Sequence, residues 1–138
     1  MSTRAISITE HDRKRLAEML SVAHEFNYRD RTDLRELEEE LSRANIVESK
    51  DIPPTVVTMN SKVRLVDLDT QEVSTFTLVF PGDANVEEGN ISVVSPIGTA
   101  ILGYSAGDAI TWRVPGGQRR LKIDAVLYQP EASGDYHL

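Results

Sequence analysis

Two consecutive prolines, Pro53 and Pro54, divide the chain into two stretches with different hydrophobic periods. Proline lacks a backbone N–H and its ring clashes with the preceding turn, so a helix does not continue through this pair. Before the prolines, apolar residues recur every three or four positions, as in a helix. After them, apolar and polar residues alternate, as in a strand. We therefore expect an α+β chain with a helical unit at residues 1–50 and a sheet unit at residues 51–138.

The helical unit contains two amphipathic stretches joined by a short polar link at residues 26–32. The first, residues 9–25, has Thr9 as its expected N-cap and one apolar stripe made of Leu16, Met19, Leu20 and Ala23. The second, residues 33–44, has a narrow apolar stripe made of Leu34, Leu37, Leu41 and Ala44, which is typical of a coiled coil. The short link predicts antiparallel pairing. We expect an antiparallel coiled-coil hairpin that forms a solvated arm about 25 Å long.

The sheet unit contains five short stretches with the alternation of strands. They begin near residue 62 and continue at residues 73–80, 91–94, 109–114 and 120–128. A short helix is expected to begin after Pro96 and to end at Gly103, because proline favours the first turn of a helix and glycine its end. These features predict a mostly antiparallel sheet of about five strands that carries one short helix.

Composition limits the classes of partner. The net charge of −7, without a basic half, argues against a general nucleic-acid binder, because binding to phosphates needs an excess of clustered Lys and Arg. No apolar run approaches the ~20 residues of a membrane span, and the first residues lack the apolar core of a signal peptide. The chain has no cysteine, which agrees with a reducing compartment. We expect a cytoplasmic monomer that needs no metal or cofactor and does not bind a membrane.

The stretch GTAILGYSAGD, residues 98–108, contains two motifs of enzymes. It is one residue short of a phosphate-binding loop, with Tyr104 in place of the lysine, and it contains the G-x-S-x-G pattern of serine hydrolases around Ser105. Both motifs need a helix after the loop, whereas here a helix is expected before it and a strand after it. A general base would have to be His137, near the chain end. We therefore interpret Gly103 and Gly107 as turn residues and expect no enzyme activity.

Three segments resemble a known family. VVTMNSKVRLVDLDTQEVSTFTLVFP, ISVVSPIGTAILGYSAGDAITWRVPGG and the ending YQPEASGDYHL are similar to the GreA/GreB transcript-cleavage factors, and above all to the Rnk branch of that family, the regulators of nucleoside diphosphate kinase. The resemblance covers nearly the whole chain. It implies an N-terminal antiparallel coiled coil and an FKBP-like C-terminal domain with a short helix.

The resemblance also implies a partner and candidate site residues. Gre factors dock on RNA polymerase at the rim of the secondary channel, and acidic residues at the coiled-coil tip help to hold a catalytic magnesium. The docking loop of the family matches Ser95 and Pro96 here, with Val94 at a position that is aspartate in some Gre proteins. Asp30 and Asp33 are the candidates for tip acids, but they do not form the Gre acidic signature. We therefore expect binding to polymerase in competition with Gre factors, without stimulation of cleavage.

Two alternatives remain open at this point. The family name allows regulation of the level or activity of nucleoside diphosphate kinase through another partner. The FKBP likeness allows prolyl isomerisation, which needs a concave pocket lined by several aromatic side chains. Aromatic residues make up only 6% of this chain, which makes the isomerase the weaker alternative.

Overall fold

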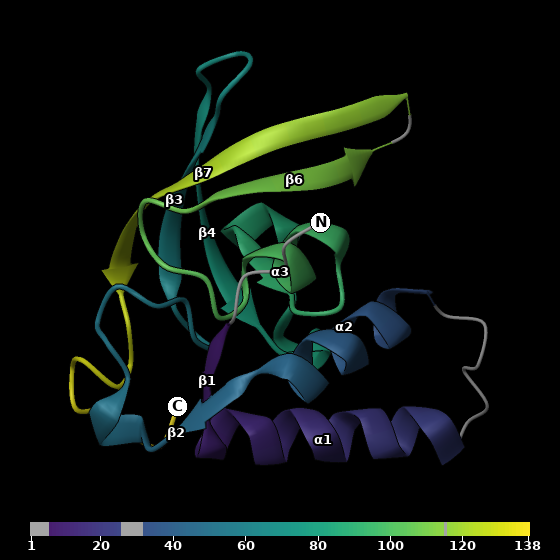
Figure 1. Cartoon of the computed structure of the whole chain (residues 1–138), viewed down its shortest axis with the longest axis vertical. Coiled ribbons are helices and arrows are strands. Elements are labelled where there is room, and N and C mark those ends of the chain that lie inside the picture. The colour runs from purple at the N-terminus through teal and green to yellow at the C-terminus, as the bar shows by residue number, and fades with distance from the viewer. Residues whose placement is uncertain (1–5, 26–31, 115) are drawn as a thin grey trace.

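The described part of the chain forms two helices, a short third helix, a five-stranded sheet and a small two-stranded sheet. The short helix lies between the helix pair and the five-stranded sheet (Figure 1). The computed structural model describes residues 6–25, 32–114 and 116–138. The helices are α1 (Glu10–Glu25), α2 (Thr32–Arg43) and α3 (Pro96–Ile101). The strands are β1 (Ser7–Thr9), β2 (Asn45–Val47), β3 (Lys62–Asp67), β4 (Val73–Val79), β5 (Asn90–Ser92), β6 (Ala109–Val114) and β7 (Gly117–Tyr128). No helix in the described part of the chain is long and apolar enough to cross a membrane.

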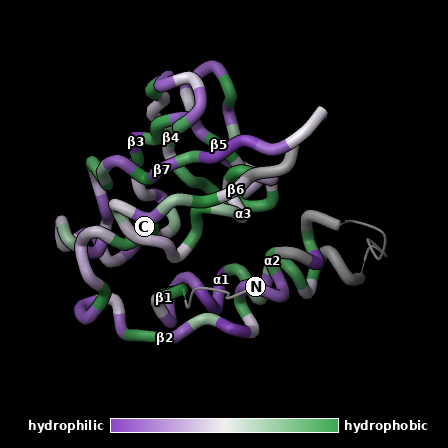
Figure 2. Tube along the Cα trace, turned by 45° about the horizontal axis from the view of Figure 1, so that its top comes forward, coloured by the Kyte–Doolittle hydropathy of each residue, from purple (hydrophilic) through white to green (hydrophobic). Residues whose placement is uncertain are grey.

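Both long helices form close to where the sequence predicts them. The hydroxyl of Thr9 accepts a hydrogen bond of 3.1 Å from the amide of Asp12, which confirms Thr9 as the N-cap of α1. Polar and apolar residues alternate along both helices (Figure 2), so each helix has one face that can be buried. In Figure 1, α2 lies beside α1, on the side that faces α3.

The leucines of both helices are part of the main core rather than of a separate coiled-coil interface. Leu16 and Leu37 have no exposed surface, and they belong to one buried cluster with sheet residues such as Leu65 and Ile123. The expectation of a solvated arm is therefore corrected for these positions. The physical reason is that α2 packs against α3, so the apolar stripe of α2 is covered by the sheet unit as well as by α1.

The sheet has the order β5-β4-β3-β7-β6. The pairs β3–β4, β3–β7 and β6–β7 are antiparallel, as predicted. The pair β4–β5 is parallel, so the sheet is mixed, and the expectation of a mostly antiparallel sheet fails only at this edge. A tight turn would reverse the chain, but β4 and β5 are joined by a longer link that contains two 3-10 turns, η2 (Pro81–Asp83) and η3 (Val86–Glu88).

A second, two-stranded sheet was not predicted. Strands β1 and β2 pair in parallel, with Ser7 opposite Asn45 and Thr9 opposite Val47. Three residues are too few for a recognisable alternation, which is why the sequence gives no signal for this pair. Because α1 follows β1 and α2 precedes β2, this small sheet joins the ends of the two helices.

Candidate functional site: the loop before α3

The loop that carries Ser95 and Pro96 connects β5 to α3. Ser95 is the N-cap of α3: its Oγ accepts a hydrogen bond of 3.1 Å from the amide of Gly98 and donates one of 2.6 Å to the carbonyl of Ser92. Pro96 is the first residue of the helix and is exposed. The Ser95 hydroxyl is thus engaged within the loop, whereas Pro96 faces solvent.

Further hydrogen bonds fix the shape of this loop. The buried hydroxyl of Thr99 donates to the carbonyl of Val93 at 2.7 Å, and the amide of Val94 donates to the hydroxyl of Ser92 at 3.2 Å. Gly98 is required here, because a Cβ at this position would lie 2.1 Å from the carbonyl oxygen of Ser92. The loop is therefore rigid before any partner binds.

The surface of the loop is mainly apolar. Val94 and Ile97 are partly buried and pack against the core, and Pro96 lies exposed between them. Such a surface can make a dry contact with another protein. The hydroxyls of Ser95 and Thr99 both donate to backbone carbonyls of this loop.

The two acids predicted for the tip of the helical unit are Asp30 and Asp33. Asp30 lies outside the described residues. Asp33 lies in the first turn of α2, and the structure describes its backbone alone. Their predicted role stays a prediction.

The glycine-rich stretch after α3 forms turns, as predicted. Gly103 and Gly107 have φ angles of +83° and +95°, a region that favours glycine. The amide of Ser105 donates to a carboxylate oxygen of Asp108 at 2.9 Å, which closes the turn before β6. A serine hydrolase would also need an acid, and two aspartates after Ser105 could supply it, but Asp124 binds Arg64 and Asp135 binds Tyr128.

Sequence reasoning missed a buried polar cluster between α1 and the sheet unit. Asp12 has no exposed surface, and its carboxylate accepts hydrogen bonds from Arg15 at 2.7 Å and from the amide of Met59 at 3.0 Å. Arg15 also donates to the backbone oxygen of Leu138 at 2.7 Å and lies 4.8 Å from the centre of the Phe80 ring. In the sequence, Asp12 and Arg15 are one helical turn apart and next to the apolar Leu16. This spacing was the signal that could have predicted a buried ion pair.

The C-terminal segment closes the same cluster. The buried carboxylate of Glu131 accepts a hydrogen bond of 2.7 Å from Thr58, and the amide of Gln129 donates to the carbonyls of Pro53 and Val56. Burial raises the pKa of both Asp12 and Glu131 above the usual range of carboxyl groups. These hydrogen bonds join α1, the segment before β3 and the chain end, so we interpret the network as structural.

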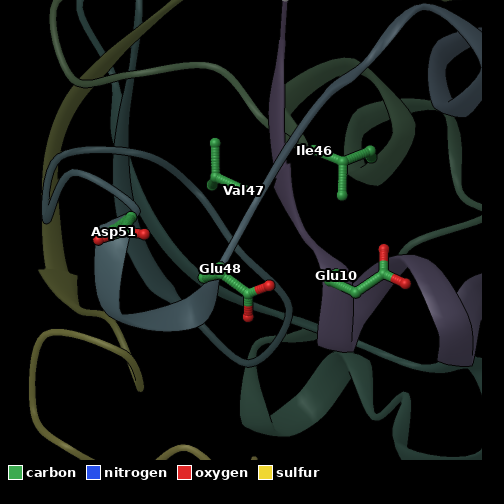
Figure 3. Close-up of a pocket in the computed structure, with 5 residues that line it drawn as sticks. All are labelled: Glu10, Ile46, Val47, Glu48 and Asp51. Atoms are coloured by element: carbon green, nitrogen blue, oxygen red, sulfur yellow. The ribbon is translucent and has the colours of Figure 1, made fainter.

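An open pocket beside β2 is lined by Glu10, Ile46, Val47, Glu48 and Asp51 (Figure 3). Two hydrogen bonds from Arg13, of 2.6 and 2.7 Å, hold the carboxylate of Glu10 and lower its pKa. A group of acids on an open surface is usually a solvated face. We assign no function to this pocket.

Two family models match the chain, one before and one from just before the two prolines onward. Residues 4–47 match the model described as Rnk N-terminus, and residues 52–128 match the model described as transcription elongation factor GreA/GreB, C-term. The second match alone covers more than half of the chain. The chain is a member of the Rnk family within the GreA/GreB superfamily. This confirms the resemblance, whereas the domain boundary at residue 50 remains a prediction.

Individual relatives agree with membership of the Rnk family. The "Regulator of nucleoside diphosphate kinase" of Escherichia coli K12 is 43% identical over 103 residues, which cover 74% of this chain and 76% of that protein. The "Transcription elongation factor GreA" of Thermodesulfovibrio yellowstonii is 33% identical over 96 residues, which cover 70% of this chain but only 61% of that protein. A solved structure of a "Prokaryotic transcription elongation factor GreA/GreB" from Nitrosomonas europaea matches with a TM-score of 0.74 at 38% identity, over 91% of this chain and all of that one.

Proposed function

We propose that this protein is a transcription regulator that binds RNA polymerase at the rim of the secondary channel, with the loop before α3 as its docking surface. Membership of the GreA/GreB superfamily supports this partner, since matched relatives are named transcription elongation factors. The observation that carries the docking surface is the exposed Pro96 at the start of α3, on a loop whose Ser95 hydroxyl and neighbouring polar groups already bind one another.

The rigidity of this loop favours binding. Its backbone is fixed by the contacts of Ser92, Ser95 and Thr99, so little conformational entropy is lost when a partner docks. The apolar side chains of Pro96 and its neighbours then exclude water from the contact. Exposed charge pairs contribute only about 0.2–1 kcal/mol each, so most of the affinity comes from this apolar contact.

The two units have different roles in this proposal. The sheet unit is an FKBP-like docking domain, and α1 with α2 forms a short helical unit packed against it. The 16 residues of α1 span about 24 Å. The chain also spans about three fifths of the GreA relatives that it matches. Short helices do not carry Asp30 and Asp33 to a deeply buried active site, so the protein occupies the entrance without stimulating cleavage and competes with Gre factors.

The docking surface can be tested with one charged substitution. Pro96→Asp places a carboxylate in the apolar contact, and an acid in the first turn of a helix is compatible with folding. We expect the Kd for purified RNA polymerase, measured by fluorescence anisotropy, to rise at least about tenfold. Pro54→Asp is the matched control, because Pro54 is also exposed but lies before β3 and outside the proposed docking loop. The Kd of this variant for polymerase should equal that of the parent. Unchanged binding of Pro96→Asp would place the docking surface elsewhere.

The name of the Escherichia coli relative supports a second candidate, direct regulation of nucleoside diphosphate kinase. An effect on transcription of the kinase gene would account for the same name without direct contact. The anisotropy experiment therefore includes the purified kinase as a second arm. Binding to the kinase without binding to polymerase would favour this second candidate.

A further inference from the structure

The backbone of Gly103 connects the sheet unit to the helices. Its N–H donates a hydrogen bond of 2.9 Å to the carbonyl of Val57, which lies before β3. Its carbonyl accepts a hydrogen bond of 3.2 Å from the amide of Ser7 in β1. Gly103 is buried, and Ile6 and Ile8 beside it are each 1% exposed. The first bond lies within the sheet unit and the second reaches β1, so the carbonyl of Gly103 links the two units while its N–H fixes Gly103 in the sheet unit.

The contact at Gly103 lies where both long helices are anchored. Thr9, the last residue of β1, directly precedes α1, and β2 follows α2 after one residue. The two strands are paired, and the amide of Asn45 donates to the carbonyl of Ile6 at 2.8 Å. Figure 1 shows β1 running from the region of α3 down to the start of α1. The position of β1 against Gly103 therefore sets the position of both helices.

A side chain at residue 103 would separate these groups. A Cβ there would lie 2.7 Å from the Cβ of Ile6 and 3.2 Å from the carbonyl oxygen of Ser7. Real Cβ atoms do not approach another carbon so closely, so β1 would have to move. We infer that Gly103 is a positioning residue that fixes α1 and α2 relative to the docking loop at the other end of α3. The positioning role concerns the fold itself, and only its relevance to polymerase binding rests on the proposed function.

A simpler role for Gly103 is that of an ordinary helix end. Glycine at this position supplies the positive φ that follows many helices, and alanine would be strained for that reason alone. Gly107 separates the two roles, because its φ of +95° is similar to the +83° of Gly103 but no atom lies within 4 Å of its Cβ position. Alanine is strained at both sites, and only at residue 103 does it also displace β1.

The test measures a distance between the units. The chain has no cysteine, so spin labels can be placed on cysteines at the exposed positions Glu18 of α1 and Lys122 of β7. We expect Gly107→Ala to give the same distance distribution as the parent by double electron–electron resonance, and Gly103→Ala to give a shifted or broadened one. Identical distributions for the two variants would overturn the inference.

A second variant covers the case in which Gly103→Ala does not fold. Ser7→Pro removes the N–H that binds the carbonyl of Gly103 and leaves residue 103 unchanged. Hydrogen exchange should accelerate about tenfold or more at the amides of β1, α1 and β2, while β3 and β7 stay protected. Equal acceleration of exchange in β3 and β7 would overturn the inference. It would show that loss of the contact destabilises the whole fold rather than the helical unit alone.

The polymerase assay distinguishes this inference from the proposed function. Gly103→Ala leaves the Ser95–Pro96 loop in place, so its Kd for polymerase should stay close to that of Gly107→Ala. Absence of polymerase binding in the parent would contradict the proposed function alone. Unchanged distances in Gly103→Ala would contradict the positioning role alone.

Discussion

The hydroxyl of Thr58 donates a hydrogen bond of 2.7 Å to the carboxylate of Glu131, and both residues are buried. Thr58 precedes β3 and Glu131 follows β7, so this bond ties the C-terminal segment to the start of the sheet. The carboxylate of Asp12 belongs to the same cluster through the amide of Met59. Two buried carboxyl groups therefore lie where α1, the sheet unit and the chain end meet.

The burial of these two carboxyl groups leads to a prediction of how stability depends on pH. Burial raises the pKa of Asp12 and of Glu131, so the folded chain holds their protons more tightly than the unfolded chain. Their contribution is present below the unfolded pKa and is lost as pH rises through the raised folded pKa. We expect the free energy of unfolding, measured with urea, to increase when the pH is lowered from 7 towards 5.

Glu131→Gln is the control for this dependence, because glutamine keeps an oxygen that can accept from Thr58 but does not titrate. The variant should show a smaller increase between pH 7 and 5. Asp67 acts in the opposite direction. The hydrogen bond from Arg119 lowers its pKa, so its contribution is lost as pH falls below the usual aspartate value of about 4. A stability that falls steadily from pH 7 to 5 in the parent would contradict the account.

Arg15 is expected to be the most important single side chain of this cluster. Arg15→Ala removes the ion pair with Asp12, the hydrogen bond to the oxygen of Leu138 and the contact with the Phe80 ring. The carboxylate of Asp12, whose side chain is only 1% exposed, then loses its cationic partner. Because Arg15 is itself 28% exposed, the loss should be roughly 2–4 kcal/mol of unfolding free energy, below the upper range for a fully buried pair.

Arg13→Ala is the matched control on the same helix. Arg13 also pairs with an acid three residues away, Glu10, but both side chains are about one third exposed or more. Solvent screens such an exposed pair, so its loss should change the unfolding free energy far less than the loss of Arg15. If urea denaturation gave the same loss of unfolding free energy for Arg13→Ala and Arg15→Ala, the buried cluster would contribute no more to stability than an exposed ion pair.

Gly98→Ala tests the rigidity of the docking loop. The new Cβ would lie 2.1 Å from the carbonyl of Ser92, so the loop must shift, and we expect a loss of about 1–3 kcal/mol despite the higher helix propensity of alanine. Gly82→Ala is the control, because no atom lies within 4 Å of that position. Thermal unfolding of the two variants gives the comparison. A Gly98→Ala variant as stable as Gly82→Ala would show that the loop is not constrained as described.

The family and most of the longer helices and strands could be predicted from the sequence. The helical period, the cap at Thr9 and the alternation after Pro54 are local signals, and the structure follows them closely. The parallel pairing of β5 was not predictable in this way, because it depends on the path of the link after β4 and not on a local pattern. The same holds for β1 and β2, which are too short to show alternation.

The site was only partly predictable. Ser95 and Pro96 could be located by resemblance, but their different roles could not: the hydroxyl of Ser95 is engaged inside the loop, and Pro96 alone is exposed. The role of Gly103 as a contact for β1 depends on Ile6 and Ser7, which lie far away in sequence. Long-range contacts of this kind leave no periodic signal.

Displacement of a Gre factor from RNA polymerase tests the central claim most directly. Fluorescently labelled GreA is bound to purified polymerase, and this protein is added in increasing amounts while anisotropy and cleavage of a backtracked transcript are followed. We predict that labelled GreA is displaced, that cleavage falls in parallel, and that Pro96→Asp displaces it much less effectively than Pro54→Asp. Saturating amounts of this protein that leave GreA bound, or that stimulate cleavage without GreA, would contradict the account.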